Sequence, residues 1–364
     1  MNVFLTGGTG FIGQALVARI LTRGWSLKVL VRDPQALAAR WIETQGATLV
    51  QGDVTRAAEL TAALKQSDVL IHNAGVYELG ANRATVARMN NVNVQGTDAM
   101  LSAAYVAGVP RVVYISSVWA LGPSGYAPSP SVAKDETWND DAPYVTAYQR
   151  SKAEAHKLAL DWRRMGLPLI TAMPNAVVGP NDHSIFGYFL RLMMLGGMSP
   201  MAWGADGVYS LVEVNALAEG LCLAAEKGAI DEDYLFCGPS ISMGELFALW
   251  AQKTGRAAPR WYLPRGFMRP QMAMMEPIQR MMGLPAFLSR DTVDTSRAHL
   301  DYSSLKAQRE LGWTHPDLES IWDPIIQKER ELMAARNGVL NKLRHQPVVA
   351  SPLLMGDQKL WAAC

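Results

Sequence analysis

Short apolar runs alternate with amphipathic stretches over the first half of the chain. The apolar runs span residues 2–6, 27–31, 47–50, 68–72, 111–117 and 167–173. Helical periodicity is found at 14–21, 56–66, 86–107 and 148–164, and in a stretch that follows the second run and ends at about residue 45. Strands that are continuous apolar runs and alternate with helices form parallel sheets buried on both faces. The pattern therefore predicts an α/β fold with a doubly wound parallel sheet.

The regular alternation ends at Pro174. Beyond it, short mixed elements rich in Met, Trp and Pro predict a smaller lobe that closes over the edge of the sheet. We expect a sheet domain at 1–175, to which 208–240 returns. The smaller C-terminal lobe then comprises 176–207 and 241–330, and residues 331–364 form a tail. Gly and Pro residues between Gly122 and Pro130 predict a loop rather than a linker between independent domains.

Three glycines, Gly7, Gly10 and Gly13, follow the first strand and open the first helix. Glycines at this spacing let the backbone turn tightly, approach a phosphate and pack the helix close to the strand. The free amides of a helix N-terminus bind anions, so the turn predicts a site for the pyrophosphate of a dinucleotide. A glycine triplet also serves ordinary tight turns, and here the flanking strand and helix favour the dinucleotide.

Tyr148 and Lys152 form a candidate acid–base pair. On a helix their spacing of four places both side chains on one face, where an ammonium group lowers the pKa of a phenol. Ser116 and Ser117 end the fifth strand and offer a hydroxyl to a substrate oxygen that exchanges a proton with Tyr148. Taken alone, the pair is also typical of a solvated helix face, and the serines of a strand-end cap.

With these motifs the chain resembles the extended short-chain dehydrogenase/reductase family, which belongs to the NAD-dependent epimerase/dehydratase superfamily. Within that family it is similar to the dihydroflavonol-reductase-like branch. Residues 6–13 match the cofactor turn T-G-x-x-G-x-x-G, and Tyr148 and Lys152 match the pair Y-x-x-x-K. Residues 305–313 are similar to the signature K-A-x-x-x-L-G-W. The resemblance covers residues 1–316 and implies a Rossmann fold that binds a nicotinamide cofactor.

The resemblance also implies roles for individual residues. Ser117 aligns best with the catalytic serine, with Ser116 as the one-residue alternative. Lys152 would bind the nicotinamide ribose and lower the pKa of Tyr148, and residues 93–97 are similar to the helix motif that supports the site. The residues expected to contact the cofactor are Gly7, Thr9, Gly10, Phe11, Ile12, Gly13, Arg32, Asp53, Val54, Asn73, Ala74, Gly75, Ser116, Tyr148, Lys152, Pro174 and Val177.

The choice between NADP and NAD rests on Arg32 and Asp33, which follow the second strand. An acidic residue in this register bonds the adenosine ribose hydroxyls of NAD. An arginine clamps the additional phosphate of NADP, and Arg32 comes first, as in the V-R-D-P pattern of NADP-using relatives. We therefore expect NADP as the preferred cofactor, with NAD as the alternative.

Composition and charge narrow the class of partner. The 364 residues carry a formal net charge of +1 with acidic and basic residues interspersed, which predicts no footprint for nucleic acid or an anionic membrane. Three cysteines without metal-ligand spacing predict no metal site and a reducing cytoplasm. A strand that begins at Asn2 leaves no room for a signal peptide. We expect a small-molecule substrate and, by resemblance only, a homodimer formed through the helix that bears Tyr148.

The methionine-rich segment 267–288 is the most apolar late stretch, yet charged residues and prolines interrupt it. It is therefore not expected to span a bilayer, which needs about 20 mainly apolar residues. We expect an amphipathic helix that covers the pocket, with an interfacial membrane segment as the alternative.

The residues of the expected lobe indicate the chemical class of the substrate. Sugar-nucleotide enzymes of the family usually have a run R-D-F-V-x-V-D-D, whose arginine grips phosphates, and here Tyr209 stands at that position. Met173 likewise stands where many relatives have an arginine. Between 181 and 208 the only cationic side chain is Arg191, which is accompanied by Phe186, Tyr188, Phe189, Met193, Met194, Met198, Met201 and Trp203. Such residues suit an apolar or aromatic ketone better than a diphosphate.

These observations predict an NADP-dependent oxidoreductase that reduces a ketone or aldehyde on a hydrophobic, flavonoid-, phenylpropanoid- or steroid-like substrate. One alternative is a nucleotide-sugar epimerase or dehydratase with tightly bound NAD(P). A second is a non-catalytic NADP-binding regulator. The sequence does not specify the substrate itself, the stereochemistry of hydride transfer or the role of residues 337–364.

Overall fold

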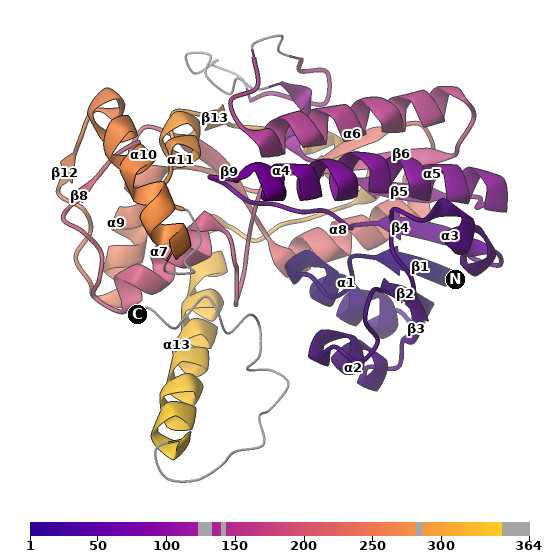
Figure 1. The fold of residues 1–364 in the computed structure, drawn as a ribbon, viewed down its shortest axis with the longest axis horizontal. Helices are drawn as coiled ribbons and strands as arrows, with labels where there is room; N and C mark the ends of the chain where they lie inside the picture. Colours follow the sequence, from indigo (N-terminus) through magenta and orange to yellow (C-terminus); the bar gives the residue numbers. More distant parts are fainter. Residues whose placement is uncertain (123–132, 140–142, 282–286, 344–364) are drawn as a thin grey trace.

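The computed structural model describes residues 1–122, 133–139, 143–281 and 287–343 (Figure 1). Most of the expected loop at 122–130 and the part of the expected tail beyond residue 343 lie outside the described residues. None of the described helices is both long and apolar enough to cross a bilayer.

A seven-stranded parallel sheet forms the larger part of the molecule, in the strand order β10-β6-β5-β4-β1-β2-β3. Its strands are β1 (Asn2–Thr6), β2 (Ser26–Val31), β3 (Thr48–Gln51), β4 (Val69–His72), β5 (Val112–Ile115), β6 (Leu169–Pro174) and β10 (Asp233–Phe236). The sequence prediction of a doubly wound parallel sheet is thus confirmed. The chain order reverses between β1 and β4, which is where open α/β sheets bind their ligands.

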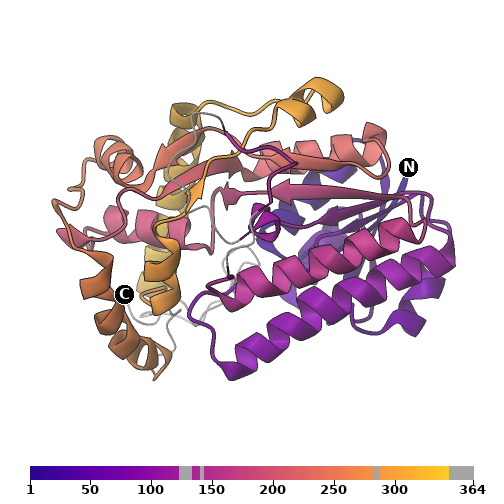
Figure 2. The ribbon, with the colours of Figure 1, turned by 90° about the horizontal axis from the view of Figure 1, so that it is seen from above.

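Helices cover both faces of this sheet, with one hydrophobic core on each side. One face carries α1 (Phe11–Thr22), α2 (Leu37–Thr44), α8 (Val214–Lys227) and α12 (Leu305–Leu311). The other carries α3 (Ala57–Leu64), α5 (Gly96–Ala107) and α6 (Ala147–Arg164), and Figure 2 shows the last two running along the sheet. Because strand side chains alternate, Val3 and Leu5 enter the first core and Phe4 the second.

The single helix expected over 86–107 is interrupted. It consists of α4 (Arg83–Met89), a π-helical turn η1 (Asn90–Gln95) and α5. The wide turn carries Asn93, whose Oδ1 accepts from the Val76 amide (2.7 Å) and whose Nδ2 donates to Ser151 Oγ on α6 (3.0 Å). A π turn interrupts the regular helical register, and such turns concentrate at functional sites. This one ties the segment after β4 to the helix that bears Tyr148.

The lobe is built around a second, smaller sheet. This sheet contains β7 (Ala176–Val178), β9 (Val208–Glu213), β11 (Ser240–Ser242) and β13 (His299–Leu300), and β8 (Met201–Ala202) pairs separately with β12 (Trp261–Tyr262). Its helices are α7 (Ile185–Met194), α9 (Met243–Thr254), α10 (Arg265–Met281), α11 (Arg290–Thr295) and α13 (Leu318–Leu343). A core centred on Trp250 and Trp322, whose rings lie 5.0 Å apart, joins several of these elements.

The segment 208–240 is divided between the two parts of the molecule. β10 is the edge strand of the large sheet and α8 packs beside α1, whereas β9 pairs with β7, β11 and β13 in the lobe. The chain therefore crosses several times between the large sheet and the lobe. These crossings hold the lobe against the sheet, and the cavity lies between them.

Candidate active site

A cavity of about 910 Å³ lies between the carboxyl ends of the large sheet and the lobe. Its sheet half is lined by residues from the strand ends and the helix starts that follow them. Expected site residues among them are Gly7, Thr9, Gly10, Phe11, Ile12, Arg32, Asp53, Val54, Asn73, Ala74, Gly75, Ser117, Tyr148 and Val177. Segments that are far apart in sequence thus meet along one wall.

The glycine turn has the geometry that a phosphate needs. Gly7 adopts a φ of +71°, and a Cβ on Gly13 would lie 2.0 Å from the Gly7 carbonyl oxygen, so the fold itself requires both glycines. A Cβ on Gly10, by contrast, would meet nothing closer than 3.4 Å. Gly10 is the N-cap of α1 and provides no side-chain cap, so the first amides of this twelve-residue helix can bind an anion. These features fit the pyrophosphate of a dinucleotide.

A buried polar chain braces the strand ends beneath this turn. His72 Nδ1 lies 2.8 Å from Thr6 Oγ1, and His72 Nε2 lies 3.1 Å from Thr97 Oγ1. The Ala74 amide donates to Thr6 Oγ1 (3.1 Å), and Asn73 Nδ2 donates to the Gly7 carbonyl (3.2 Å). Burial, assisted by the charge of Lys152, lowers the pKa of His72 to about 3. The imidazole is therefore neutral and links β1, β4 and α5.

Arg32 and Asp33 differ in where they point. Arg32 is exposed and lines the cavity, whereas Asp33 does not line it. Asp33 Oδ1 instead accepts a hydrogen bond from the Gln35 amide (2.9 Å) in the turn after β2. After the adjacent strand β3, hydrogen bonds from Thr55 and the nearby charge of Arg32 hold the pKa of Asp53 below its ordinary value. Arg32 and Asp53 thus lie close together on the same wall of the cavity, which Arg88 of α4 lines as well.

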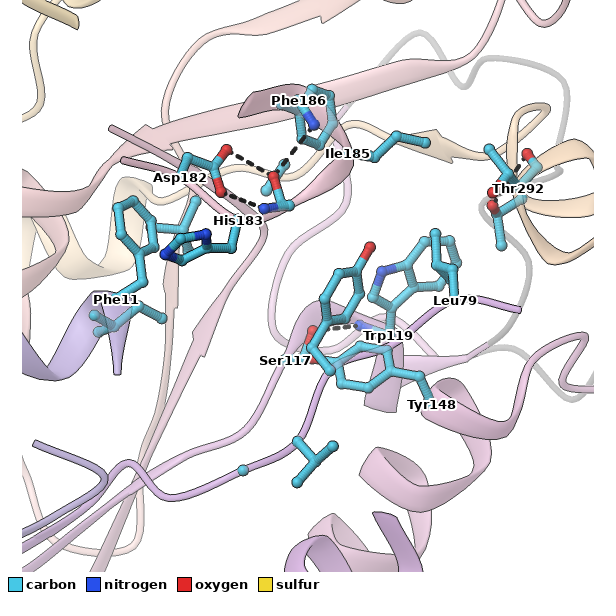
Figure 3. Close-up of a pocket in the computed structure, with 18 of the residues that line it drawn as sticks. Phe11, Leu79, Ser117, Trp119, Tyr148, Asp182, His183, Ile185, Phe186 and Thr292 are labelled. Carbon is cyan, nitrogen blue, oxygen red and sulfur yellow. Dashed lines mark hydrogen bonds between the residues drawn. The ribbon is translucent and has the colours of Figure 1, made fainter. Parts of the chain in front are cut away.

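Ser117 and Tyr148 meet where the two halves of the cavity join. Figure 3 shows the phenol of Tyr148 extending from α6 toward Ser117. Thr146 begins α6 with a capping box that includes Gln149, which fixes the start of the helix next to Tyr148. Ser117 lies two residues after the end of β5 and caps the short helix η2 (Val118–Leu121). Burial raises the pKa of Tyr148 to about 12, and a hydrogen bond with Ser117 offsets part of that rise.

Lys152 lies one turn further along α6 and is buried. Its Nζ donates to the Ile115 carbonyl at the end of β5 (3.1 Å), and burial lowers its pKa to about 8. The lowering of the Tyr148 pKa expected from Lys152 is not seen: burial raises the pKa, and only the hydrogen bond with Ser117 opposes that rise. A Cβ on Gly75 would lie 3.7 Å from Lys152 Nζ, so the ammonium sits directly behind the cavity wall.

Four expected cofactor residues do not line the cavity: Gly13, Ser116, Lys152 and Pro174. Gly13 supports the turn from behind, and Pro174 lies in β6. Ser116 Oγ lies 3.4 Å from His156 Nδ1 in the interior. Adjacent residues of an extended chain point in opposite directions, so only the second serine of the pair, Ser117, faces the cavity.

The lobe half of the cavity is apolar and aromatic. Side chains of this kind that line it are Phe186, Phe189, Leu192, Met198, Met201, Trp203, Tyr209, Met243, Phe247 and Leu288. Tyr188, Met193 and Met194, which were expected here, are not among its lining residues. Arg191 is not a pocket cation either: it is buried, pairs with Glu329 (3.2 Å) and donates to the Asp182 carbonyl (2.6 Å). Within the described residues from 175 onward, no Lys or Arg lines the cavity.

Some lining residues were missed by the sequence analysis. Leu79 and Trp119 project into the cavity beside Tyr148 and Ser117 (Figure 3) and follow β4 and β5, so the rule that ligands sit at strand ends points to them. Thr292 and Leu288 come from around α11, for which the sequence holds no such signal. Asp182 lines the cavity too, but its carboxylate accepts bonds from Ser184 and the Gly187 amide at the start of α7.

Comparison with known proteins agrees with this geometry. The model of the NAD dependent epimerase/dehydratase family matches residues 3–237. The chain belongs to this family. Its members bind a nicotinamide dinucleotide, which fits the glycine turn and the sheet half of the cavity. The chain is thus an NAD(P)-dependent oxidoreductase of the extended short-chain dehydrogenase/reductase type.

Several relatives are named as reductases or dehydrogenases. The chain is 27% identical to a 4-hydroxy-2-methyl-3-oxo-4-farnesyl-3,4-dihydroquinoline-1-oxide ketoreductase of Stigmatella aurantiaca, over 86% of this chain and 92% of the relative. It is 29% identical to a Synechocystis protein named for dihydroflavonol 4-reductase, over 85% and 89% of the two chains. A 3 beta-hydroxysteroid dehydrogenase/Delta 5-->4-isomerase of Mycobacterium tuberculosis is 27% identical over 86% and 85%.

Solved structures share the fold. The crystal structure of gox2253 superposes with a TM-score of 0.75 at 31% identity, covering 90% of this chain and 98% of that one. A UDP-glucose 4-epimerase of Thermotoga maritima has a TM-score of 0.73 at 19% identity, covering 92% and 100%. An epimerase therefore shares this fold, so the fold does not identify the chemistry, which only the residues of the site can distinguish.

Proposed function

We propose that the protein is an NADP-dependent reductase of a hydrophobic ketone or aldehyde. The observation that carries this proposal is the position of Ser117 and Tyr148 between a dinucleotide-shaped wall and an apolar lobe whose described residues contribute no Lys or Arg to the lining. A nucleotide sugar carries a diphosphate, which needs cationic or amide donors on its own side of the cavity. The lobe instead offers aromatic and methionine side chains, which suit a flavonoid-, phenylpropanoid- or steroid-like ring system.

The acid–base residues define the proposed mechanism. When bound, the cofactor supplies the hydride that forms the new C–H bond at the carbonyl carbon. Tyr148 keeps its proton throughout the neutral range, because its pKa is about 12, and gives it to the carbonyl oxygen as negative charge builds there. The Ser117 hydroxyl donates a hydrogen bond to the same oxygen. Lys152, still charged below about pH 8, would stabilise the phenolate that Tyr148 leaves behind and, as the family resemblance implies, would bond the nicotinamide ribose.

The preference for NADP is proposed on the side chains after β2. Arg32 faces the adenosine end of the cavity, whereas the Asp33 carboxylate is engaged in a local turn. A guanidinium group pairs with a ribose phosphate through charge-assisted hydrogen bonds, and a carboxylate would repel it. The names of the ketoreductase and hydroxysteroid relatives support a large hydrophobic substrate. The cytoplasmic location and the homodimer through α6 remain predictions.

The proposal is tested by incubating the purified protein with NADPH or NADH and a panel of flavanonols, phenylpropanoid aldehydes and 3-keto steroids. We expect net oxidation of NADPH with at least one carbonyl, and a lower kcat/KM with NADH. Turnover of a UDP- or GDP-sugar without net consumption of NADPH, and no reaction with any carbonyl, would show an epimerase instead. Tight NADPH binding without any turnover would favour the non-catalytic regulator.

A further inference from the structure

Helix α10 exposes apolar side chains to the solvent and buries polar ones, which is the reverse of an ordinary surface helix. Its exposed large side chains are Phe267, Met274, Ile278 and Met281, spaced by seven, four and three residues, so they form one stripe along the helix. Met274 is 73% exposed and Met281 is 88% exposed. The opposite face, which is buried, carries Glu276 and Gln279 beside Met272. The polar side of this helix thus points inward and its apolar side outward.

Polar contacts hold the helix in this orientation. Glu276 Oε1 accepts from the Arg290 amide (2.7 Å), and Gln279 Nε2 donates to the Leu288 carbonyl (2.7 Å). Arg269 pairs with Asp294 (2.9 Å), and Arg280 donates to the Gly80 carbonyl on the sheet side of the cavity. The outward apolar stripe is therefore a fixed feature of the surface.

The stripe continues onto the adjacent strand pair. Trp261 on β12 is 61% exposed and stands in register with Met201 on β8, which is 51% exposed, and Tyr262 follows. Figure 1 shows β8, β12 and α10 together at the lobe end of the molecule. We call Met201, Trp261, Phe267, Met274, Ile278 and Met281 the apolar face. Tyr262, the next residue of β12, points to the opposite side of the strand pair, in register with the buried Ala202. Several exposed large apolar side chains on neighbouring elements are typical of an interaction surface, whereas single scattered ones are ordinary.

Positive charge gathers next to this face. Residues 253–281 contain six basic side chains and one acidic one, although the whole chain has a net charge of only +1. Carboxylates pair with four of the six, Lys253, Arg265, Arg269 and Arg280. Arg256 and Arg260 form no salt bridge with any described residue, and Arg260 directly precedes Trp261. Arg260, which has no salt-bridge partner among the described residues, thus lies beside Trp261 at one end of the apolar face, and Arg256 lies four residues earlier in the chain.

We propose that the apolar face docks on the surface of an anionic lipid bilayer, with α10 lying in the plane of the interface. An apolar stripe on a helix, basic residues nearby and a Trp at the edge are the features of in-plane interfacial segments. A symmetric contact between two copies of the chain would bring both pairs of free arginines together, whereas anionic headgroups neutralise them. Charge complementarity therefore favours the bilayer as the occupant.

Docking would connect the bilayer with the cavity. Met201 belongs to the apolar face and also lines the cavity. Leu288 lines the cavity too, and its carbonyl accepts a hydrogen bond from Gln279 of α10. A hydrophobic carbonyl compound dissolved in the bilayer would thus enter without crossing water. This consequence rests on the proposed function, but the docking itself does not.

The test measures co-sedimentation of the full chain with vesicles of phosphatidylcholine alone or with one third phosphatidylserine. We expect binding to the anionic vesicles that weakens with salt. Replacing Met274 and Ile278 by Glu together should reduce the bound fraction by about tenfold or more, since apolar burial is lost and negative charge added. The double variant R256E/R260E should reduce binding to anionic vesicles and leave the weak binding to neutral ones unchanged. The matched control is V106E, because Val106 is 69% exposed on α5, remote from the apolar face.

Light scattering coupled to size-exclusion chromatography measures the oligomeric state of the same variants. It distinguishes docking on a bilayer from docking of a second copy of the chain. Conversion of a dimer into a monomer by M274E/I278E, without vesicle binding by the parent protein, would overturn the proposal in favour of a second copy. Equal binding of the parent protein and both double variants would also overturn it. NADPH binding, which none of these positions contacts, verifies that each variant is folded. Vesicle binding without any carbonyl turnover would reject the proposed function and leave the docking intact.

Discussion

The two halves of the cavity are built in different ways. The sheet half is made from short contiguous motifs at strand ends, where the backbone itself shapes the site, as at Gly7 and Gly13. The lobe half is assembled from side chains of β8, β9, α7, α9 and the segment around α11. Backbone-defined sites restrict the sequence tightly, whereas a site lined by interchangeable apolar side chains restricts it weakly. The type of cofactor can therefore be deduced from the sequence, whereas the substrate can be deduced only as a chemical class.

The largest expected effect separates catalysis from binding. Replacing Tyr148 by Phe should lower kcat/KM for carbonyl reduction by about 10²–10⁴-fold, because the proton donor is lost. The Kd for NADPH, measured by fluorescence titration, should stay within about twofold, since the nucleotide wall is unchanged. Tyr77 packs edge-on against Tyr148, with ring centroids 4.8 Å apart, so Y77F is the matched control and should retain most activity. Comparable losses in both variants would contradict the assignment of Tyr148.

Two glycines of the same turn should respond differently to alanine. G13A places a Cβ 2.0 Å from a carbonyl oxygen and should lower the free energy of unfolding by about 3 kcal/mol or more. G10A meets no such obstacle and should fold normally, yet weaken NADPH binding because its methyl group stands at the N-terminus of α1. Denaturant unfolding and NADPH titration of both proteins provide the measurements. Normal NADPH affinity of G10A would show that the pyrophosphate lies elsewhere.

The neutral His72 beneath the sheet half should make stability depend on pH. Its folded pKa of about 3 lies below the unfolded value near 6.5, so the unfolded chain binds the extra proton in that window. The contribution of His72 to the free energy of unfolding is complete above about pH 6.5. It decreases as the pH is lowered, by about 2 kcal/mol between pH 7 and pH 5. The variant H72Q should show a change in unfolding free energy smaller by that amount over the same interval. An unchanged pH dependence would mean that His72 has the same pKa in the native and unfolded states, which would contradict the lowered native value.

Cofactor choice should depend on the side chain that faces the cavity. R32A should raise the KM for NADPH by about tenfold to a hundredfold, because charge-assisted bonds to the ribose phosphate are lost, and should change the KM for NADH little. D33A, at the neighbouring position that does not line the cavity, is the control and should alter neither KM strongly. If D33A impaired NADH use while R32A had no effect on NADPH, the preference would be for NAD.

The smallest effect is expected in the lobe half. F189A should raise the KM for the carbonyl substrate by about tenfold, as the loss of an apolar contact in a binding pocket does, without changing the Kd for NADPH. Tyr188 precedes it on α7 but does not line the cavity, so Y188A is the control. Steady-state kinetics with the best substrate of the panel distinguish the two. An equal change in both variants would indicate altered packing of α7 rather than a substrate contact.

The order of apolar runs and helices was sufficient to predict the parallel sheet, because strand and helix periodicities are local properties of the chain. The glycine turn was predictable for the same reason, since its backbone conformations depend on adjacent residues. The predicted helix at 86–107 missed the π turn, because what stabilises it is the bonding of Asn93 to Val76 and Ser151, which are distant in sequence. The sequence also left Ser116 and Ser117 as alternatives, and only the fold orients one of them into the cavity.

The lobe shows the limit of local patterns most clearly. The sequence showed Arg191 as the only cationic side chain between 181 and 208 but gave no sign of its partner, and in the fold it forms a buried ion pair with Glu329. The net charge of +1 predicted no site for an anionic membrane; that expectation stays a prediction, and the vesicle experiment tests it against the proposed docking of the apolar face. Sequence by itself thus determined the sheet and the location of the cofactor turn. Tertiary structure decided which side chains face the cavity and which face the solvent, because that depends on contacts between segments far apart in the chain.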